Sequence, residues 1–183
     1  RFSLYYPEKR QFFLEGKNYY DMNIGDINLF YSRRIGIYQN NVVPIIGGVR
    51  LFGKLNKTNI GIMSIQTAAI DSIPTTNYSI IKVKQDIFKQ SSIGVILTQN
   101  YSDTHYKRVF GTDFTYSTSE VFGEKNLLVG GSIAISETKI FGETDSLNSN
   151  NLAYNVFLSY PNDIVEYDLG FTTIEPNFNP EIE

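Results

Sequence analysis

Three acidic side chains offer the clearest opportunity for acid–base chemistry. Asp113, Glu166 and Asp168 fall on the polar positions of segments that alternate polar and apolar residues. Two carboxylates about 5–10 Å apart can hydrolyse a glycosidic bond, one as the acid and the other as the base or nucleophile. Membrane β-barrels also line their interior with charged residues, without any catalysis. The pattern therefore favours a structural role, and we expect no enzymatic activity.

Metal and phosphate chemistry have little support in the sequence. His105 is the only histidine, and Asp103 lies two positions before it, whereas a zinc site takes three or four ligands. The stretch VPIIGGVRL (43–51) contains two glycines but lacks the spacing of a phosphate-binding loop. A strand that another backbone approaches closely is the better interpretation of these glycines. We therefore expect no metal and no cofactor.

Composition narrows the class of protein. The 183 residues include 16 basic and 19 acidic side chains, and the net charge of −3 gives no electrostatic case for nucleic-acid binding. Cysteine is absent, which excludes disulfide bonds and thiol chemistry. The sequence contains no run of about 18 apolar residues, which a transmembrane helix would need. The length suffices for one domain with its own core. Because the first residue is Arg1 and not Met, we expect an excised part of a longer protein.

The elements that must position these residues are β-strands. Seven segments alternate apolar residues with polar or small ones, which is typical of strands with two different faces. An eighth segment, NIGIMSIQT (59–67), is strand-like without a clear assignment of its faces, and NLFYSRRIG (28–36) is a further candidate. The seven alternating segments are 49–56, 79–87, 92–101, 108–118, 128–136, 152–160 and 165–173.

The predicted strands are long enough to cross a bilayer at a tilt, which takes about 9–11 residues. Ordinary strands average only about 5–6 residues. One face carries aliphatic side chains, with Tyr or Phe near the strand ends, as in the lipid-facing band and aromatic girdles of an outer-membrane barrel. The residues expected to face lipid are Leu51, Ile81, Val83, Val95, Leu97, Val156, Leu158, Leu169 and Phe171.

The other face carries charged, glycine and small polar residues, as a wet barrel interior does. Placing a Lys or Arg in the middle of the hydrocarbon instead costs about 2–4 kcal/mol. We therefore expect the charged strand residues to line a lumen. They are Arg50, Lys54, Lys82, Lys84, Asp113, Glu166 and Asp168.

The connections between the predicted strands alternate in length. Short and longer connections take turns, as in outer-membrane barrels with short periplasmic turns and long outer loops. The connection at 119–125 fits poorly, because it is longer than a tight turn. The short connections are 56–58, 88–92 and 161–163, and the longer ones are 70–77, 102–107 and 141–150.

Two of the longer connections contain a short modification motif. DSI (71–73) and DSL (145–147) resemble the Asp–Ser–aliphatic O-glycosylation acceptor of Bacteroidota envelopes. The resemblance makes Ser72 and Ser146 candidate O-glycosylation sites. Asp–Ser is also an ordinary turn pair.

The segment YYPEKRQFFLEG (5–16) places charges beside large apolar side chains. We expect residues 1–27 to lie in the mouth or lumen of a barrel formed by 28–183, where the apolar side chains bury. Buried charges need partners, since an unpaired one costs several kcal/mol. The alternative is an ordinary turn at Pro7 followed by a short edge strand. In the lumen interpretation, Glu8, Arg10 and Glu15 pair with cations such as Arg33, Arg34 and Arg50, and Arg10 and Glu15 are mostly buried.

Three stretches together resemble a known family. YYPEKRQFFLEG (5–16), LFYSRRIG (29–36) and FNPEI (178–182) are similar to the family called domain of unknown function 5916, which occurs in Bacteroidota envelopes. Residues 43–67 and 91–98 continue the resemblance. It implies an outer-membrane barrel that follows a carbohydrate-binding-like module of family 9. That module lies outside this sequence, so the resemblance transfers no sugar-binding or catalytic residue.

The sequence thus predicts an all-β, antiparallel transmembrane β-barrel segment, a meander of eight or nine long strands belonging to a larger barrel. The expected function is an integral component of a bacterial outer membrane, a channel or a scaffold linked to a periplasmic carbohydrate-binding-like module. Its expected partners are outer-membrane lipid and periplasmic glycan or other envelope proteins. The alternative is a soluble periplasmic β-domain that binds or hydrolyses glycan, which needs a second layer over its apolar face.

Overall fold

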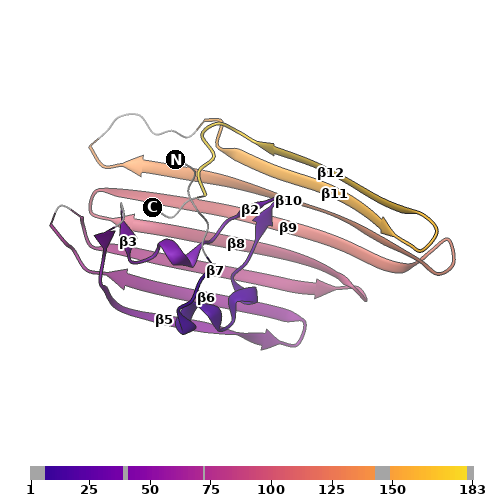
Figure 1. Cartoon of the computed structure of the whole chain (residues 1–183), viewed down its shortest axis with the longest axis horizontal. Coiled ribbons are helices and arrows are strands. Elements are labelled where there is room, and N and C mark those ends of the chain that lie inside the picture. The colour runs from indigo at the N-terminus through magenta and orange to yellow at the C-terminus, as the bar shows by residue number, and fades with distance from the viewer. Residues whose placement is uncertain (1–6, 39–40, 72, 143–148, 181–183) are drawn as a thin grey trace.

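The computed structural model describes residues 7–38, 41–71, 73–142 and 149–180. Its dominant element is one antiparallel sheet of eight strands in the order β12-β11-β10-β9-β8-β7-β6-β5, so that each strand pairs with its neighbours in sequence (Figure 1). The strands are β5 (Ile45–Leu55), β6 (Thr58–Thr67), β7 (Thr76–Ile87), β8 (Ser91–Ser102), β9 (His105–Val121), β10 (Lys125–Ile140), β11 (Leu152–Pro161) and β12 (Glu166–Ile174). The all-β class and the antiparallel meander predicted from the sequence are confirmed.

The prediction of a strand at 28–36 is wrong. The chain forms only the short strand β2 (Ile27–Asn28) there and then the 3₁₀ turn η2 (Ser32–Arg34). These residues belong to an N-terminal segment, 7–44, which we call the strap. The main sheet therefore begins at Ile45 and not near residue 28. The other elements of the strap are α1 (Gln11–Leu14), η1 (Lys17–Tyr19), β1 (Asn23–Ile24), β3 (Ile37–Tyr38) and β4 (Asn41–Val42).

The strap crosses the sheet from one edge toward the other and returns (Figure 1). On the outward pass, the Tyr20 hydroxyl lies 3.3 Å from the carbonyl oxygen of Leu51 in β5. Further along, Ser132 of β10 donates to the carbonyl oxygen of Asn23 at 3.1 Å. The hairpin of β1 and β2 turns back at Gly25–Asp26, and the chain then leads into β5. One short segment thus braces strands that are distant in sequence.

Four small residues in one row across the sheet, Gly61, Gly111, Ala134 and Ala153, make room for the strap. The pairing register connects Phe52, Gly61, Lys82, Ile96, Gly111, Ala134, Ala153 and Ile174 directly across all eight strands. A side chain at Gly61 would collide with the backbone of Tyr19, and one at Gly111 with Leu29 and Ile96. The absence of these side chains lets the strap backbone lie directly on the sheet.

The core lies between the strap and this row. Strap residues such as Phe13, Tyr20, Ile24 and Leu29 are buried against the sheet residues that face them. From the sheet, the core takes Met63, Ile65, Ile80, Ile96, Val109, Ala134 and Ala153. We call the face of the sheet that carries the strap the strap face. The opposite face is the bare face.

The two ends of the sheet differ in their connections. At one end the turns 56–57, 88–90, 122–124 and 162–165 are all short. The connection at 119–125 is a tight turn and not a longer loop, because β9 and β10 extend to Val121 and Lys125. At the other end, two connections are long, 68–75 and 141–151. The prediction of a long loop at 102–107 is wrong. β8 and β9 remain paired to Tyr101 and Tyr106, which leaves a tight turn there. We call the first end of the sheet the short-turn end and the second the long-loop end.

Over the described ranges of the chain, the sheet is not closed into a barrel. β5 and β12 are its two edges, and neither pairs with another strand among the described residues on its free side. The eight-stranded antiparallel sheet is thus present, and the larger barrel to which it is expected to belong stays a prediction.

Gly61 should tolerate no side chain while the strap is docked. Gly61→Ala would place a methyl group against the Tyr19 carbonyl and the Tyr20 ring, and overpacking of this kind costs about 1–3 kcal/mol. Urea unfolding of the variant would measure the loss. Gly53→Ala is the matched control, because nothing lies within 4 Å of the added carbon. Equal stability of the two variants would contradict the placement of the strap.

Candidate functional site

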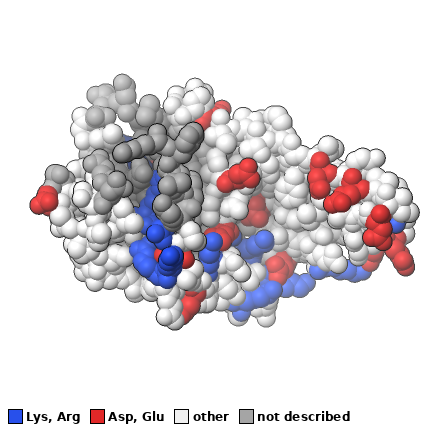
Figure 2. Space-filling model, in the orientation of Figure 1, with Lys and Arg blue, Asp and Glu red and all other residues white. Residues whose placement is uncertain are grey.

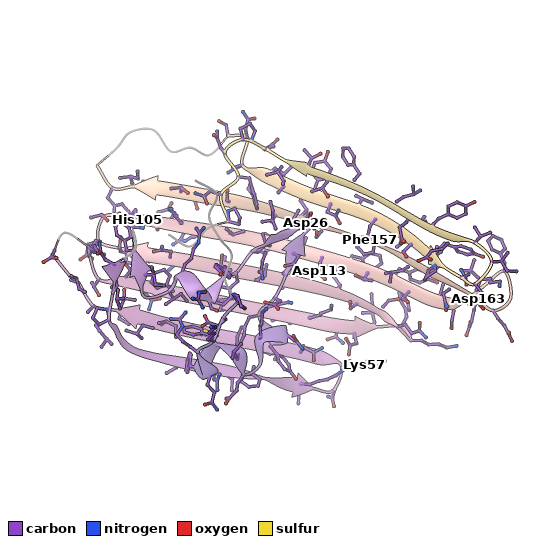
Figure 3. The ribbon with its side chains drawn as sticks, viewed as in Figure 1. Asp26, Lys57, His105, Asp113, Phe157 and Asp163 are labelled. Carbon is purple, nitrogen blue, oxygen red and sulfur yellow. The ribbon has the colours of Figure 1, made fainter. Side chains whose placement is uncertain are left out.

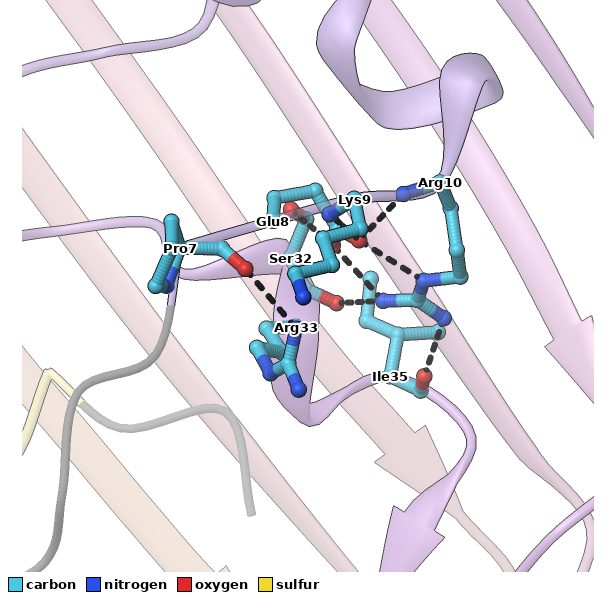
Figure 4. A network of polar contacts seen from close by, with 7 residues as sticks. All are labelled: Pro7, Glu8, Lys9, Arg10, Ser32, Arg33 and Ile35. Carbon is cyan, nitrogen blue, oxygen red and sulfur yellow. Dashed lines mark hydrogen bonds and ion pairs between the residues drawn. The ribbon is translucent and has the colours of Figure 1, made fainter.

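The strap face holds the polar network that the N-terminal motif builds (Figure 4). The Glu8 carboxylate accepts hydrogen bonds from Arg10 Nη2 at 2.8 Å and Ser32 Oγ at 2.9 Å. Arg10 Nη1 in turn donates to the carbonyl oxygen of Ile35 at 2.7 Å, and its guanidinium lies 4.2 Å from the centre of the Phe13 ring. The network therefore ties the outward pass of the strap to its return pass.

The charges in this network are paired within the strap itself. Arg10, and not a cation of the sheet, is the salt-bridge partner of Glu8, whose side chain is only 6% exposed. Arg33 donates to the carbonyl oxygen of Pro7 at 2.7 Å, and Arg34 lies beside it in η2. The structure thus gathers Glu8, Arg10, Arg33 and Arg34 in one region of the strap.

Glu8 should make stability depend on acid pH. Burial acts to raise the pKa of the Glu8 carboxyl, but hydrogen bonds from Arg10 and Ser32 and the Arg10 charge outweigh it and lower this pKa from 4.5 to about 2. Since the folded-state pKa is the lower one, the network stabilises the fold fully above pH 4.5 and loses this contribution as the pH falls toward 2.

Urea unfolding between pH 6 and pH 2.5 would measure this dependence. We expect wild type to lose more stability over that range than Glu8→Gln, which cannot titrate at this position. Asp26→Asn is a control that removes a different strap carboxyl. Parallel pH profiles for wild type and Glu8→Gln would exclude the proposed linkage.

Arg50 joins the strap to the first strand of the sheet. Its guanidinium donates to the Phe12 carbonyl and to the Glu15 carboxylate, and it lies over the Phe12 ring. The side chain of Arg50 is 17% exposed, but that of Glu15 is 48% exposed. The expectation that Glu15 is mostly buried is therefore wrong, because α1 turns it toward the surface. Arg10, at 37%, is only partly buried.

The lysines of the strap face have different surroundings. Lys82 is buried and donates from Nζ to the carbonyl oxygen of Asp21 in the strap. Lys54 forms a 2.6 Å ion pair with Asp86 at the more exposed short-turn side. Lys84 is half-buried on the same face as Lys82, two residues further along β7. Of the three, Lys82 has the direct bond to the strap.

The three carboxylates considered for hydrolysis are not gathered around a common cavity. Asp113 lies between Gly94 and Ser132 in the centre of the sheet, and its buried Oδ1 has no hydrogen-bond partner among the described residues. Glu166 and Asp168 lie on the exposed edge strand β12. β12 is three strands from β9, about 14 Å at the usual spacing between strands. Figure 3 shows Asp113 in the middle of the sheet, beneath the strap.

The strap contains a cavity of about 370 Å³ that the sequence did not predict. Aromatic side chains line it, together with acidic groups and Lys17. Burial raises the pKa of the Asp21 carboxyl, against the lowering effects of Lys17, Asn28 and Lys82. No sequence period marks these residues, because they meet only when the strap folds back on itself. They include Glu8, Phe13, Lys17, Tyr20, Asp21, Asp26, Phe30 and Tyr31.

His105 lies at the tight turn of the long-loop end, far from Lys57 and Asp163 at the other end (Figure 3). Its Nδ1 lies 3.0 Å from the Ser102 hydroxyl and 3.1 Å from that of Thr104. The described part of the chain contains no group of three or more acidic or histidine residues placed to hold a metal ion. The candidate glycosylation sites, Ser72 and Ser146, lie outside the described residues.

The bare face is a broad apolar surface. In the register, Leu51, Ile62, Ile81, Leu97, Phe110 and Ile135 form one continuous row, and Tyr116, Val129, Leu158 and Leu169 another. Val129 is half-buried, and the other side chains of the two rows are exposed to solvent, from 37% for Leu158 to 66% for Leu169. All nine residues expected to face lipid lie on this face, and the seven charged strand residues lie on the strap face, where acidic and basic groups mix (Figure 2).

The fold and these surfaces define an all-β protein with a braced polar face and an uncovered apolar face. No family model, no curated protein and no solved structure matches the chain. None of the described helices is long and apolar enough to cross a membrane.

Proposed function

We propose that this chain is a strand-forming segment of a bacterial outer-membrane β-barrel, with the strap inside the lumen as a brace or plug. The observation that carries the proposal is the bare face, which exposes apolar side chains on every strand of the sheet. The largest apolar patch on a soluble monomer is typically about 300–600 Å². Lipid is the environment in which a broader apolar face needs no protein layer above it.

The stagger of the strands supports this proposal. The register places Phe52, near the end of β5, in the same row as Ile174, the last residue of β12. The central residue of β12, Gly170, lies in the row that reaches Asp86, beside the turn after β5. Closing a sheet into a barrel requires tilted strands and such a progressive shift.

The borders of the apolar band also support it. Tyr101, Tyr106 and Phe141 form an aromatic cluster at the long-loop end of the bare face, and Tyr116 and Tyr167 lie toward the short-turn end. Aromatic girdles mark both interfaces of outer-membrane barrels. The charged bare-face residues of the described strands likewise lie beyond the middle of the band, with Arg108, Glu137 and Lys139 at one end and Glu120 at the other.

The two free edges fit a larger barrel. β5 and β12 are long edge strands, which soluble proteins usually shorten, cover or charge on both faces to avoid aggregation. Further strands would pair with both edges. The resemblance to the domain of unknown function 5916 family points the same way and connects the barrel with a periplasmic carbohydrate-binding-like module, so that the role would be that of a channel or scaffold.

The alternative proposal is a soluble periplasmic β-domain that binds glycan. The aromatic and acidic cavity of the strap favours it, because binding sites are concave and combine apolar walls with a few polar groups. In this case a second protein layer must cover the bare face.

Extraction from cell envelopes would separate the two proposals. We expect the protein to stay in the membrane fraction after a carbonate wash, to require detergent, and to migrate differently on gels before and after heating. These are the properties of a barrel that resists unfolding in detergent. Release into the periplasmic extract without detergent would exclude the barrel and support the soluble domain.

A further inference from the structure

A cationic patch lies at the long-loop border of the bare face. In the register, Arg108 of β9 faces Glu137 of β10, and Tyr106 faces Lys139 two positions further. By alternation with Phe110, all four side chains lie on the bare face. Arg108 and Lys139 are both exposed. We call these four residues, with Tyr101 and Phe141, the border patch.

Arg108, one of the two cations of the border patch, lies over an aromatic ring. The Arg108 guanidinium lies 4.5 Å from the centre of the Tyr106 ring, and its Nε donates to Gln99 at 2.9 Å. The Tyr106 hydroxyl donates to Glu137 at 2.8 Å, which fixes the ring under the guanidinium. The rings of Tyr106 and Phe141 lie 6.1 Å apart. The side chains of Arg108 and Tyr106 are therefore oriented before any ligand binds.

Some of the hydrogen-bond donors of Arg108 and Lys139 have no acceptor in the part of the chain that the structure describes. Within the described residues, the two Nη groups of Arg108 and the Nζ of Lys139 have no hydrogen-bond acceptor or salt-bridge partner. Guanidinium and ammonium groups prefer phosphate oxygens, and arginine can bind them with two parallel hydrogen bonds. An anion here would lie directly beside the apolar band.

We propose that the border patch binds the phosphate group of an anionic membrane lipid, whose acyl chains lie along the bare face. The inference rests on the proposed membrane function, because it requires lipid at this face. The patch offers positive charge at the level of the headgroups, aromatic rings at the interface and aliphatic side chains below. A soluble anion would use only the first of these features.

Tryptophan fluorescence can test the proposal directly, because the chain contains no tryptophan. Phe141→Trp keeps an aromatic ring in the patch and reports contact with brominated lipids, which quench it. The protein is reconstituted in bilayers of phosphatidylcholine, and brominated phosphatidylglycerol or brominated phosphatidylcholine is titrated in. One cation near an anionic surface strengthens lipid binding by a factor of about five. Arg108 and Lys139 together should therefore favour the anionic lipid over phosphatidylcholine by about five- to 25-fold.

Variants assign this preference to the patch. Arg108→Gln combined with Lys139→Gln should bring the ratio to about one. Lys57→Gln combined with Lys89→Gln removes the same charge at the short-turn end and should leave the ratio unchanged. Arg108→Lys, which keeps the charge, should retain most of the preference. A ratio near one in the reporter protein, or a ratio that survives the double substitution in the patch, would overturn the inference.

Two further results separate the possible failures. Absence of quenching by either lipid would mean that the bare face does not meet lipid, which overturns the proposed function together with this inference. Quenching without preference overturns the inference alone. Inorganic phosphate, added at constant ionic strength, should not change the ratio. If it abolished the preference, the patch would be a site for free phosphate and the lipid assignment would be wrong.

Discussion

Replacing Tyr20 by alanine should destabilise the folded protein by about 3–5 kcal/mol, the usual cost of removing a large aromatic side chain from a core. Tyr20 is 1% exposed, and its ring lies near those of Phe30 and Phe52. It fills the space above Gly61 that the row of small residues leaves open. The cavity left by its removal cannot be refilled by the rigid sheet beneath. Urea unfolding would measure the loss.

Tyr20→Phe is the matched control for this experiment. It keeps the ring and removes only the hydroxyl, whose bonds to the carbonyls of Leu51 and Ile62 are long, at 3.3 and 3.4 Å. We expect a loss of about 1 kcal/mol or less. Limited proteolysis of Tyr20→Ala should also cleave the strap earlier than the sheet. A stable Tyr20→Ala protein with a protected strap would show that the strap does not depend on this anchor.

Leu158→Lys should cost about 2–4 kcal/mol in a bilayer, because it would place a charge in the hydrocarbon. Leu158 lies on the bare face in the row of Val129 and Leu169. In a soluble protein, the same change at an exposed position usually alters stability by at most about 0.5 kcal/mol. The difference makes the substitution a direct test of what surrounds the bare face. Folding into lipid vesicles from urea, followed by titration back to the unfolded state, would give the free energy.

Ser159→Lys is the control from the neighbouring position. Ser159 points to the strap face and pairs with Asp168 across the strands, so a lysine there gains an acidic neighbour and remains outside the lipid. We expect a change of less than about 1 kcal/mol. Equal effects of the two lysines would argue against a membrane at the bare face. A larger effect at Ser159 would reverse the assignment of the faces.

In the proposed barrel, the strap would serve both as a plug and as a structural element. Its backbone is bonded to two strands on either side of the centre of the sheet, through Lys82 of β7 and Ser132 of β10. Glu8 and Arg10 pair within the strap, whereas Glu15 pairs with Arg50 of β5. Such a segment can hold eight strands together as one body while it fills part of the space that a barrel would enclose.

The sequence by itself determined the eight strands of the sheet and, except for 59–67, their faces. Alternation depends only on residues two positions apart, because successive side chains of a strand point to opposite sides. The apolar set from Leu51 to Phe171 and the charged set from Arg50 to Asp168 were therefore assigned to opposite faces before any pairing was known. The positions of most turns followed from the ends of these alternating segments.

Only the tertiary structure decided the path of the strap, the row of small residues beneath it and the border patch. Each depends on the register between strands, which brings together residues as distant as Gly61 and Ala153 and which no local period reveals. The same holds for 28–36, where a strand candidate forms a 3₁₀ turn and Leu29 packs onto Gly111. Glu15 remains exposed for a related reason, since the short helix α1 fixes its direction independently of its charge. Side-chain alternation is a local property, whereas the partners of a side chain follow from how the strands align.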